Sequence, residues 1–216
     1  EVSMNSSALS KFSKMLPKAG EVEVILYQKA GIGTGNQANN PWLQELPDPV
    51  SKVTWDNYIT MNLGTMEANG YNMTIDQEHG ASLATVTVGD KSMELPVYPS
   101  PGQAPGTISI ALGYGRGANG ENIGKSAFQT KEYGGYETDA DGNKLAIGKN
   151  AFVFASGMQF AQAGSITKVE GVYPIATTQI HHTVMGRNSI VKETTLNGYK
   201  TLDKQAYNAD HKLMKI

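Results

Sequence analysis

Short runs in which every second residue is apolar, separated by stretches rich in glycine and proline, recur along this chain. Residues 21–30 (EVEVILYQKA) alternate in this way, and residues 82–98 do so on both sides of a Gly89–Asp90 step. A period of two residues is typical of half-buried strands, and a Gly–Asp step between two such runs predicts a hairpin. The chain is therefore expected to fold mainly as β structure.

Further strands are expected at residues 107–112, 151–155 and 166–180. The core residues expected in the last of these are Val169, Val172 and Ile175. Glycine occurs 24 times in 216 residues, which is about 11% against a usual value near 7%. A net charge of −2 and 10 tyrosines argue against disorder, so these facts together favour a globular fold with many turns.

The two ends of the chain differ from its middle. Apolar residues spaced three apart within residues 9–16 predict a short helix, which Pro17 closes. We expect residues 1–20 to form a lead-in helix or linker and residues 21–200 to form the β domain. Residues 201–216 are polar and are expected to form a tail or a linker to a following domain.

Residues 31–55 show no regular period and form an expected long, ordered loop. Pro47 and Pro49 prevent regular strand pairing across the residue between them. Loops of this length are usually functional or contribute to an interface. The alternative is a structural loop in which Trp42 and Leu43 plug the core.

Composition excludes several classes of function. With 18 basic and 20 acidic residues, the chain has no excess of positive charge to bind nucleic acid or an anionic membrane. The apolar runs are too short to span a bilayer. Because cysteine is absent, disulfides, thiolate metal sites, cysteine-ligated clusters and thiol nucleophiles are excluded from this segment.

The recognisable glycine and histidine patterns do not amount to a catalytic site. The glycines of residues 31–35 follow a strand, but no amphipathic helix follows them to hold a pyrophosphate, and residues 113–120 lack a P-loop lysine. On a strand, His181 and His182 would point to opposite faces and could not bind one ion together. No serine lies in a G-x-S-x-G elbow. We therefore assign no catalytic residue and no metal ligand.

One internal similarity interrupts the β pattern. The hexapeptide at residues 123–128 (IGKSAF) recurs at residues 147–152 (IGKNAF), with a polar, turn-rich stretch between the two copies. Repeat folds need three or more units. The similarity therefore indicates either a duplicated local turn or a hairpin inserted between two similar strand entries.

Several ordered stretches carry a resemblance to a known family. They are residues 39–49 (NNPWLQELPDP), Lys52 with 54–58, 95–97 with 101–107, 111–116, and 181–182 with 186–193. Together they resemble the iron–sulfur, molybdopterin-oxidoreductase-like large subunit of bacterial alternative complex III. The resemblance spans roughly residues 22–199, and the inserted stretch between the two hexapeptides departs from the family pattern.

The resemblance implies a fold and a cellular setting. This segment would be the carboxy-terminal, molybdopterin-dinucleotide-binding-like domain, a six-stranded double-psi β-barrel with short peripheral helices. In that family this half of the subunit lacks the molybdenum cofactor, and iron–sulfur clusters lie elsewhere in the parent subunit. The expected location is the periplasmic side of the bacterial inner membrane, peripheral and within a quinol-oxidising respiratory complex.

Two functions follow from the resemblance, and a third from composition. The first is a non-catalytic structural and interaction domain that contacts other domains of its own subunit and other subunits. Its expected interface residues are Trp42, Leu43, Pro47, Trp55 and Arg187. The second is an active molybdopterin-dinucleotide-binding domain of a molybdenum oxidoreductase, with Asn40, Gln44 and Arg116 binding the cofactor. The third is a carbohydrate- or peptide-binding barrel with a groove lined by aromatic residues.

Overall fold

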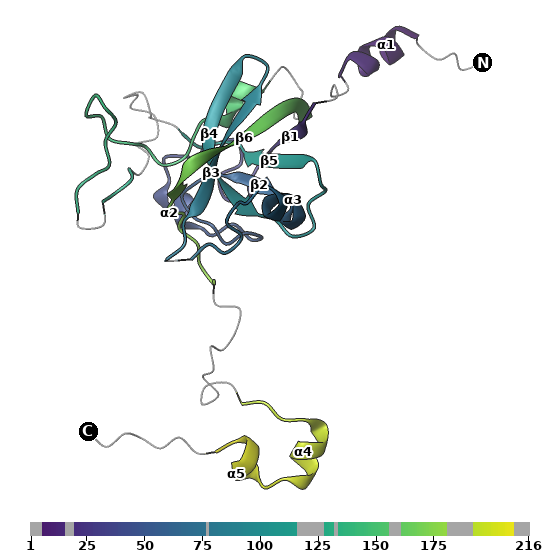
Figure 1. The fold of residues 1–216 in the computed structure, drawn as a ribbon, viewed down its shortest axis with the longest axis vertical. Helices are drawn as coiled ribbons and strands as arrows, with labels where there is room; N and C mark the ends of the chain where they lie inside the picture. The colour runs from purple at the N-terminus through teal and green to yellow at the C-terminus, as the bar shows by residue number, and fades with distance from the viewer. Residues whose placement is uncertain are drawn as a thin grey trace. The chain divides into compact units, whose positions relative to one another are not determined.

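Six β-strands form a closed, mainly β structure in the computed structural model (Figure 1). They are β1 (Val22–Tyr27), β2 (Ile59–Met61), β3 (Ala81–Val88), β4 (Lys91–Pro99), β5 (Thr107–Ala111) and β6 (Ala161–Tyr173). Their hydrogen-bonded order is β1-β5-β2-β4-β3-β6, and β6 pairs with β1 to close the ring. The predicted β fold, the hairpin of β3 and β4 and the strands at β1 and β5 are thus confirmed.

The order and direction of the strands repeat within the chain. Strands β1 and β5 are parallel, as are β2 and β4, whereas the other four neighbouring pairs are antiparallel. Exchanging β1 with β4, β2 with β5 and β3 with β6 leaves both the ring order and the direction of every pair unchanged. The two sets of three consecutive strands, β1–β3 and β4–β6, therefore interleave around the ring and follow one plan, in which a short helical turn precedes the third strand.

The helices are short. They are α1 (Ser6–Met15), α2 (Pro41–Glu45), α3 (Leu63–Ala68), the 3-10 turn η1 (Ala151–Phe154), α4 (Leu196–Thr201) and α5 (Lys204–Tyr207). The helical turns that precede β3 and β6 are α3 and η1, and both begin after an asparagine cap. The side chain of Asn62 accepts hydrogen bonds at the start of α3, and that of Asn150 does so at η1.

The structure describes residues 6–15, 20–76, 78–115, 128–131, 134–155, 161–180 and 192–209. The chain divides into two compact units, Glu1–Thr178 and Gln179–Ile216. All six strands belong to the first unit, whereas α4 and α5 belong to the second. The division falls before residue 200, where we expected the β domain to end.

The interior of the ring is filled by the side chains that point inward from the strands. Along β1 the burial alternates as the sequence predicted, with Val22, Val24 and Leu26 buried. The largest fully buried apolar side chains include Tyr58, Ile59, Met61, Met66, Leu95, Ile108, Ile110 and Leu112. Burying apolar surface of this kind is the main favourable contribution to folding.

Two expectations for the later strands were wrong. Residues 151–155 form no strand: residues 151–154 are η1 and Ala155 is its C-cap, because Asn150 accepts the Phe152 amide and turns the backbone into a 3-10 helix. Val172 is 62% exposed and lies outside the core, whereas Ile175 is buried as expected. Val172 pairs with Ser82 beside a β-bulge, where the alternation of β6 is interrupted.

The polar stretch between the two hexapeptides forms an inserted pair of hairpins. An antiparallel bridge joins Phe128 to Ala146 at its base, and two further bridges, Thr130 to Tyr136 and Thr138 to Lys144, close one small hairpin each. The described residues 128–131 and 134–146 are called the insertion below. The first hexapeptide, apart from its last residue, lies outside the described residues. The stretch between the copies thus contains hairpins, but the second copy leads into η1 and not into a strand.

Candidate functional site

Residues 40–55, called the anchor loop below, are held in place by their own side chains. The Oδ1 atom of Asn40 accepts a hydrogen bond from the Trp42 amide at 3.1 Å and caps α2, whose first residue is proline. The Nε2 atom of Gln44 donates to the carbonyl of Ala38 at 2.7 Å. Two of the three side chains assigned to a cofactor by resemblance, Asn40 and Gln44, therefore have partners within or beside the loop.

The second half of the anchor loop is fixed by Asp48. Its Oδ1 atom accepts the amides of Val50 at 3.0 Å and Ser51 at 2.8 Å, as an Asx turn does. The amide of Trp55 donates to the carbonyl of Gln44 at 2.9 Å and joins the two halves. The backbone of this loop is thus well defined, although its sequence shows no periodic pattern.

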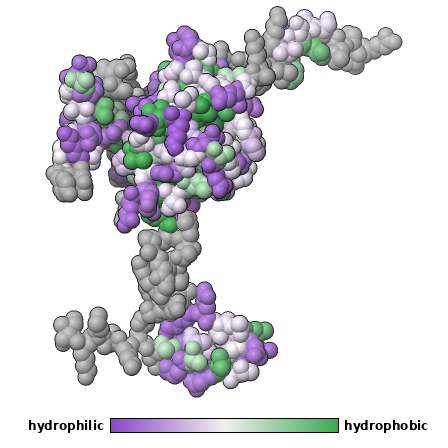
Figure 2. Space-filling view, in the orientation of Figure 1, coloured by the Kyte–Doolittle hydropathy of each residue, from purple (hydrophilic) through white to green (hydrophobic). Residues whose placement is uncertain are grey.

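Apolar side chains project from this fixed backbone. Trp42 is 79% exposed, Leu46 is 52% exposed and Val50 is 83% exposed. Leu43 and Pro47 are half-buried. The reading of Trp42 as a core plug is wrong, whereas Leu43 is partly covered. On the face drawn in Figure 2, hydrophobic residues form small, separate areas among hydrophilic ones.

Residues 52–54 of the anchor loop are hydrogen-bonded to residues 176–178 at the end of the first unit, and the backbone of the loop is strained there. Lys52 and Trp55 adopt positive φ angles of 63° and 68°, which side chains other than glycine rarely do. Between them, the amide of Thr54 donates to the Ala176 carbonyl at 2.9 Å. The amide of Thr178 donates to the Lys52 carbonyl at 2.9 Å. Trp55 itself is half-buried.

A buried lysine lies beside the residue that follows the anchor loop. Lys29 is 6% exposed, and its Nζ atom donates to the backbone carbonyl of Asp56 at 3.2 Å. The same ammonium lies 4.0 Å from the ring centroid of Tyr58 and 5.2 Å from that of Tyr114. Burial lowers the Lys29 pKa to about 8, and the nearby carboxylates of Asp48 and Asp56 oppose this shift.

Asp56 and Asn57, called the clamp below, hold the second hexapeptide against the ring. The Asp56 carboxylate accepts the Tyr173 hydroxyl at 3.0 and 3.2 Å and the Gly148 amide at 3.1 Å. Asn57 accepts the Lys149 amide at 2.8 Å and donates to the Lys149 carbonyl at 2.8 Å. Burial raises the Asp56 pKa to about 6, and hydrogen bonds from Tyr173 and Gly148 lower it in part.

Glycine allows the backbones around the clamp to approach closely. A Cβ atom on Gly115, whose φ is +73°, would lie 2.3 Å from the amide nitrogen of Asn150. A Cβ atom on Gly113 would lie 2.7 Å from the amide nitrogen of Gly35. The glycine runs at residues 31–35 and 113–115 therefore serve backbone packing between loops.

The remaining candidates are distributed as follows. Two arginines and three histidines lie outside the described residues, namely Arg116, Arg187, His181, His182 and His211. His79 Nδ1 lies 2.8 Å from an Asp76 carboxylate oxygen on the surface. In the part of the chain that the structure describes, no three histidine or carboxylate side chains are grouped to hold a metal ion.

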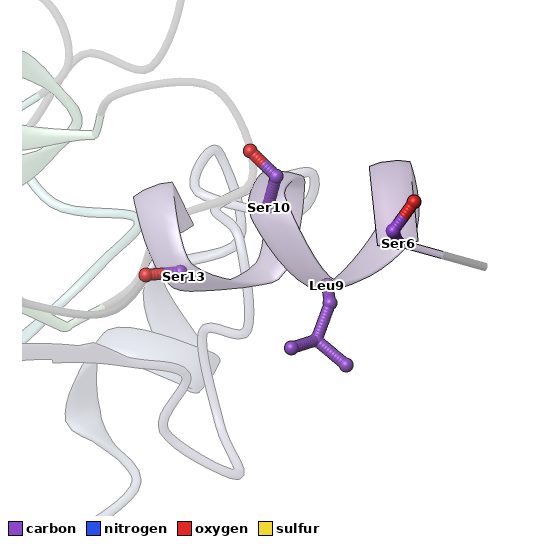
Figure 3. Close-up of a pocket in the computed structure, with 4 residues that line it drawn as sticks. All are labelled: Ser6, Leu9, Ser10 and Ser13. Atoms are coloured by element: carbon purple, nitrogen blue, oxygen red, sulfur yellow. The ribbon is translucent and has the colours of Figure 1, made fainter. Parts of the chain in front are cut away.

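A shallow hollow on α1 offers few groups that could bind or react. Figure 3 shows its lining, which comprises Ser6, Leu9, Ser10 and Ser13. These residues recur every three or four positions and so share one face of a single short helix. Three hydroxyls and one leucine offer neither charge nor a nucleophile with a neighbouring base.

Two features of this arrangement bear on function: the exposed apolar side chains of the anchor loop and the buried titratable groups beside it. The anchor loop presents apolar side chains on a backbone that needs no ordering before contact, which lowers the entropic cost of binding a protein surface. The clamp and Lys29 bury titratable groups that respond to pH. Sequence reasoning found the anchor loop from its proline and tryptophan content but did not find Lys29, Asp56 or Tyr173.

Within the described residues, no helix has the length and apolar character needed to span a membrane. No known family model matches this chain, and no curated protein matches it either.

Proposed function

We propose that this chain is a non-catalytic structural and interaction domain of a molybdopterin-oxidoreductase-like iron–sulfur subunit in a quinol-oxidising respiratory complex. Its task is to dock, through the anchor loop, against other domains of the same subunit and other subunits. The iron–sulfur clusters lie elsewhere in the parent, and the domain lies at the periplasmic side of the inner membrane.

The proposal includes a double-psi topology for the ring. Its support is the internal exchange of β1, β2 and β3 with β4, β5 and β6, which preserves strand order and direction. Such a duplicated arrangement, in which each of the two parallel pairs joins one strand from each half, fits the barrel that the resemblance implies. Comparing the paths of the two strand-to-strand crossovers in an experimental structure would test this assignment.

The observation that carries the interaction role is the combination of exposed apolar side chains and a fixed backbone. Tryptophan is enriched among the residues that dominate binding at interfaces. Trp42 is exposed although its amide, together with Gln44 and Asp48, takes part in bonds that hold the loop. A loop fixed in this way with its tryptophan directed outward is suited to docking and less suited to filling a core.

The present residues fit a pterin dinucleotide poorly in the described conformation. The carbonyl oxygen of Asn40 and the amide nitrogen of Gln44, which would face polar edges of the cofactor, bond instead to the protein backbone. A scaffold role therefore has better support than the alternative, an active molybdenum oxidoreductase. In that alternative the bound group would supply the redox chemistry, and this chain would only bind and orient it.

The experiment uses the intact parent protein, tagged and purified from the cells that make it. We expect the purified assembly to contain iron but less than one molybdenum atom per subunit, measured by elemental analysis. The double variant Trp42→Ala, Leu46→Ala should lower the assembly mass in size-exclusion chromatography. Val172→Ala, which removes a side chain of comparable exposure on β6, should leave the mass unchanged.

Two results would contradict the proposal. Stoichiometric molybdenum and pterin in the purified protein would favour the active oxidoreductase. A parent protein that elutes at the mass of its own polypeptide, or an assembly that is indifferent to the double variant, would remove the docking role.

A further inference from the structure

The clamp connects the ring to the base of the insertion. The insertion returns to the ring at Ala146, and the clamp binds the segment that follows, at Gly148 and Lys149. Asn57 also donates to the Ala111 carbonyl at the end of β5 at 3.0 Å. Detaching residues 148–150 would therefore free the base of the insertion while the six strands stay paired.

In the part of the chain that the structure describes, four titratable side chains lie around the Asp56 carboxyl. Lys29 follows β1, Tyr173 ends β6, Tyr114 follows β5, and Lys149 belongs to the clamped segment. The two lysines favour the carboxylate, but they do not overcome the loss of solvation in this buried position. The tyrosines stay protonated because their own pKa values are raised by burial.

We propose that Asp56 is a proton-controlled latch, in which uptake of one proton by its buried carboxyl tightens the hold of the ring on residues 148–150 and on the insertion. Opening the latch exposes Asp56 to water, where its carboxyl prefers to be ionised. Closing it removes that solvent. The closed state therefore binds the proton more strongly than the open state does, and acid favours closure.

Both protonation states can keep the latch contacts. A neutral carboxyl still accepts the Gly148 amide through its carbonyl oxygen, and its hydroxyl can donate to Tyr173, which then accepts. Protonation thus removes the penalty of a buried charge without breaking the contacts that hold the segment. Lys29 acts in a separate range above about pH 8, where its own ammonium loses a proton.

The expected effect can be worked out from the two states. With a carboxyl pKa of about 6 in the closed state and 3.8 in the open state, the opening equilibrium constant falls roughly tenfold between pH 7.5 and pH 5. Native-state amide exchange reports such local opening. The amides to follow in the full chain are those of Gly148 and Lys149, corrected for the intrinsic pH dependence of exchange.

Variants separate the latch from other carboxylates. Asp56→Asn imitates the neutral carboxyl and should abolish the pH dependence of opening at Gly148. Asp90→Asn changes an exposed carboxyl in the β3–β4 turn and should leave the tenfold change intact. The amides of β1 and β5 serve as the reference for global unfolding and should exchange more slowly than Gly148 at pH 7.5.

Three outcomes would overturn the proposal. They are a corrected opening constant at Gly148 that does not change with pH, an Asp56→Asn protein that keeps the wild-type response, and exchange of Gly148 only together with β1 and β5. If Asp56→Asn does not fold, the Asp56 carboxyl is titrated by carbon NMR in the wild type. A midpoint near pH 6, shared by the Gly148 amide shift, is expected, and a midpoint near pH 4 would refute the latch.

Discussion

Replacing Gly115 by alanine tests whether the close packing around the clamp stabilises the ring. The new Cβ atom would lie 2.3 Å from the Asn150 nitrogen and 2.5 Å from the Lys149 carbonyl carbon, both of them backbone atoms. Overpacking of this kind typically costs about 1–3 kcal/mol. The displaced segment would also strain the two bonds from Asn57, each worth about 1 kcal/mol. A positive φ adds about 1–2 kcal/mol for any residue with a Cβ atom.

The control is Gly102→Ala, because Gly102 has a similar φ of +85° but no atom within 4 Å of the added Cβ. We expect Gly115→Ala to lower the free energy of unfolding by about 4 kcal/mol and Gly102→Ala to lower it by about 1 kcal/mol. Urea denaturation followed by circular dichroism measures both, with an unchanged m-value as the check on two-state behaviour. Equal losses in the two variants would show that the approach of residues 113–115 to residues 149–150 contributes nothing.

Three further substitutions test other parts of the structure. Lys52→Gly should raise the free energy of unfolding by about 0.5 kcal/mol, because glycine tolerates the φ of 63°, whereas Lys91→Gly on β4 should lower it. Asn57→Ala should lower it by about 3 kcal/mol, since three hydrogen bonds of a fully buried side chain are lost; a loss below 1 kcal/mol in chemical denaturation would contradict this. Because the Asp56 pKa is raised to about 6 in the folded state, the folded chain holds a proton that the unfolded chain releases from about pH 4 upward. The difference in unfolding free energy between wild type and Asp56→Asn should therefore fall by about 2 kcal/mol from pH 4 to pH 7, and a constant difference would refute the burial argument.

Strands with a clean period of two were predictable from the sequence. β1 and the hairpin of β3 and β4 obey local rules, since each buries one face and the connecting turn has its own residue preference. The sequence failed where tertiary contacts decide. Residues 151–155 read as a strand from their apolar composition, but the cap of Asn150 and the burial of Ala151 and Phe154 favour a helical turn.

The candidate site divides in the same way. The anchor loop was visible because proline and tryptophan at residues 41–49 are local signals. Lys29 gave no signal, because its burial comes from Tyr58 and Tyr114, which are distant in sequence. Asp56 depends in the same way on Tyr173, which lies 117 positions away. No window of a single sequence can bring such partners together.

The clamp follows the anchor loop directly in the sequence, and three consecutive residues at their junction form hydrogen bonds within the first unit. Thr54 bonds to the Ala176 carbonyl, Trp55 to the Gln44 carbonyl, and Asp56 to the Gly148 amide. The bonds of Thr54 and Asp56 reach segments outside the loop, whereas the bond of Trp55 closes the loop on itself. The exposed side chain of Trp42 therefore stands on a loop whose end is hydrogen-bonded to two segments that are distant in the sequence.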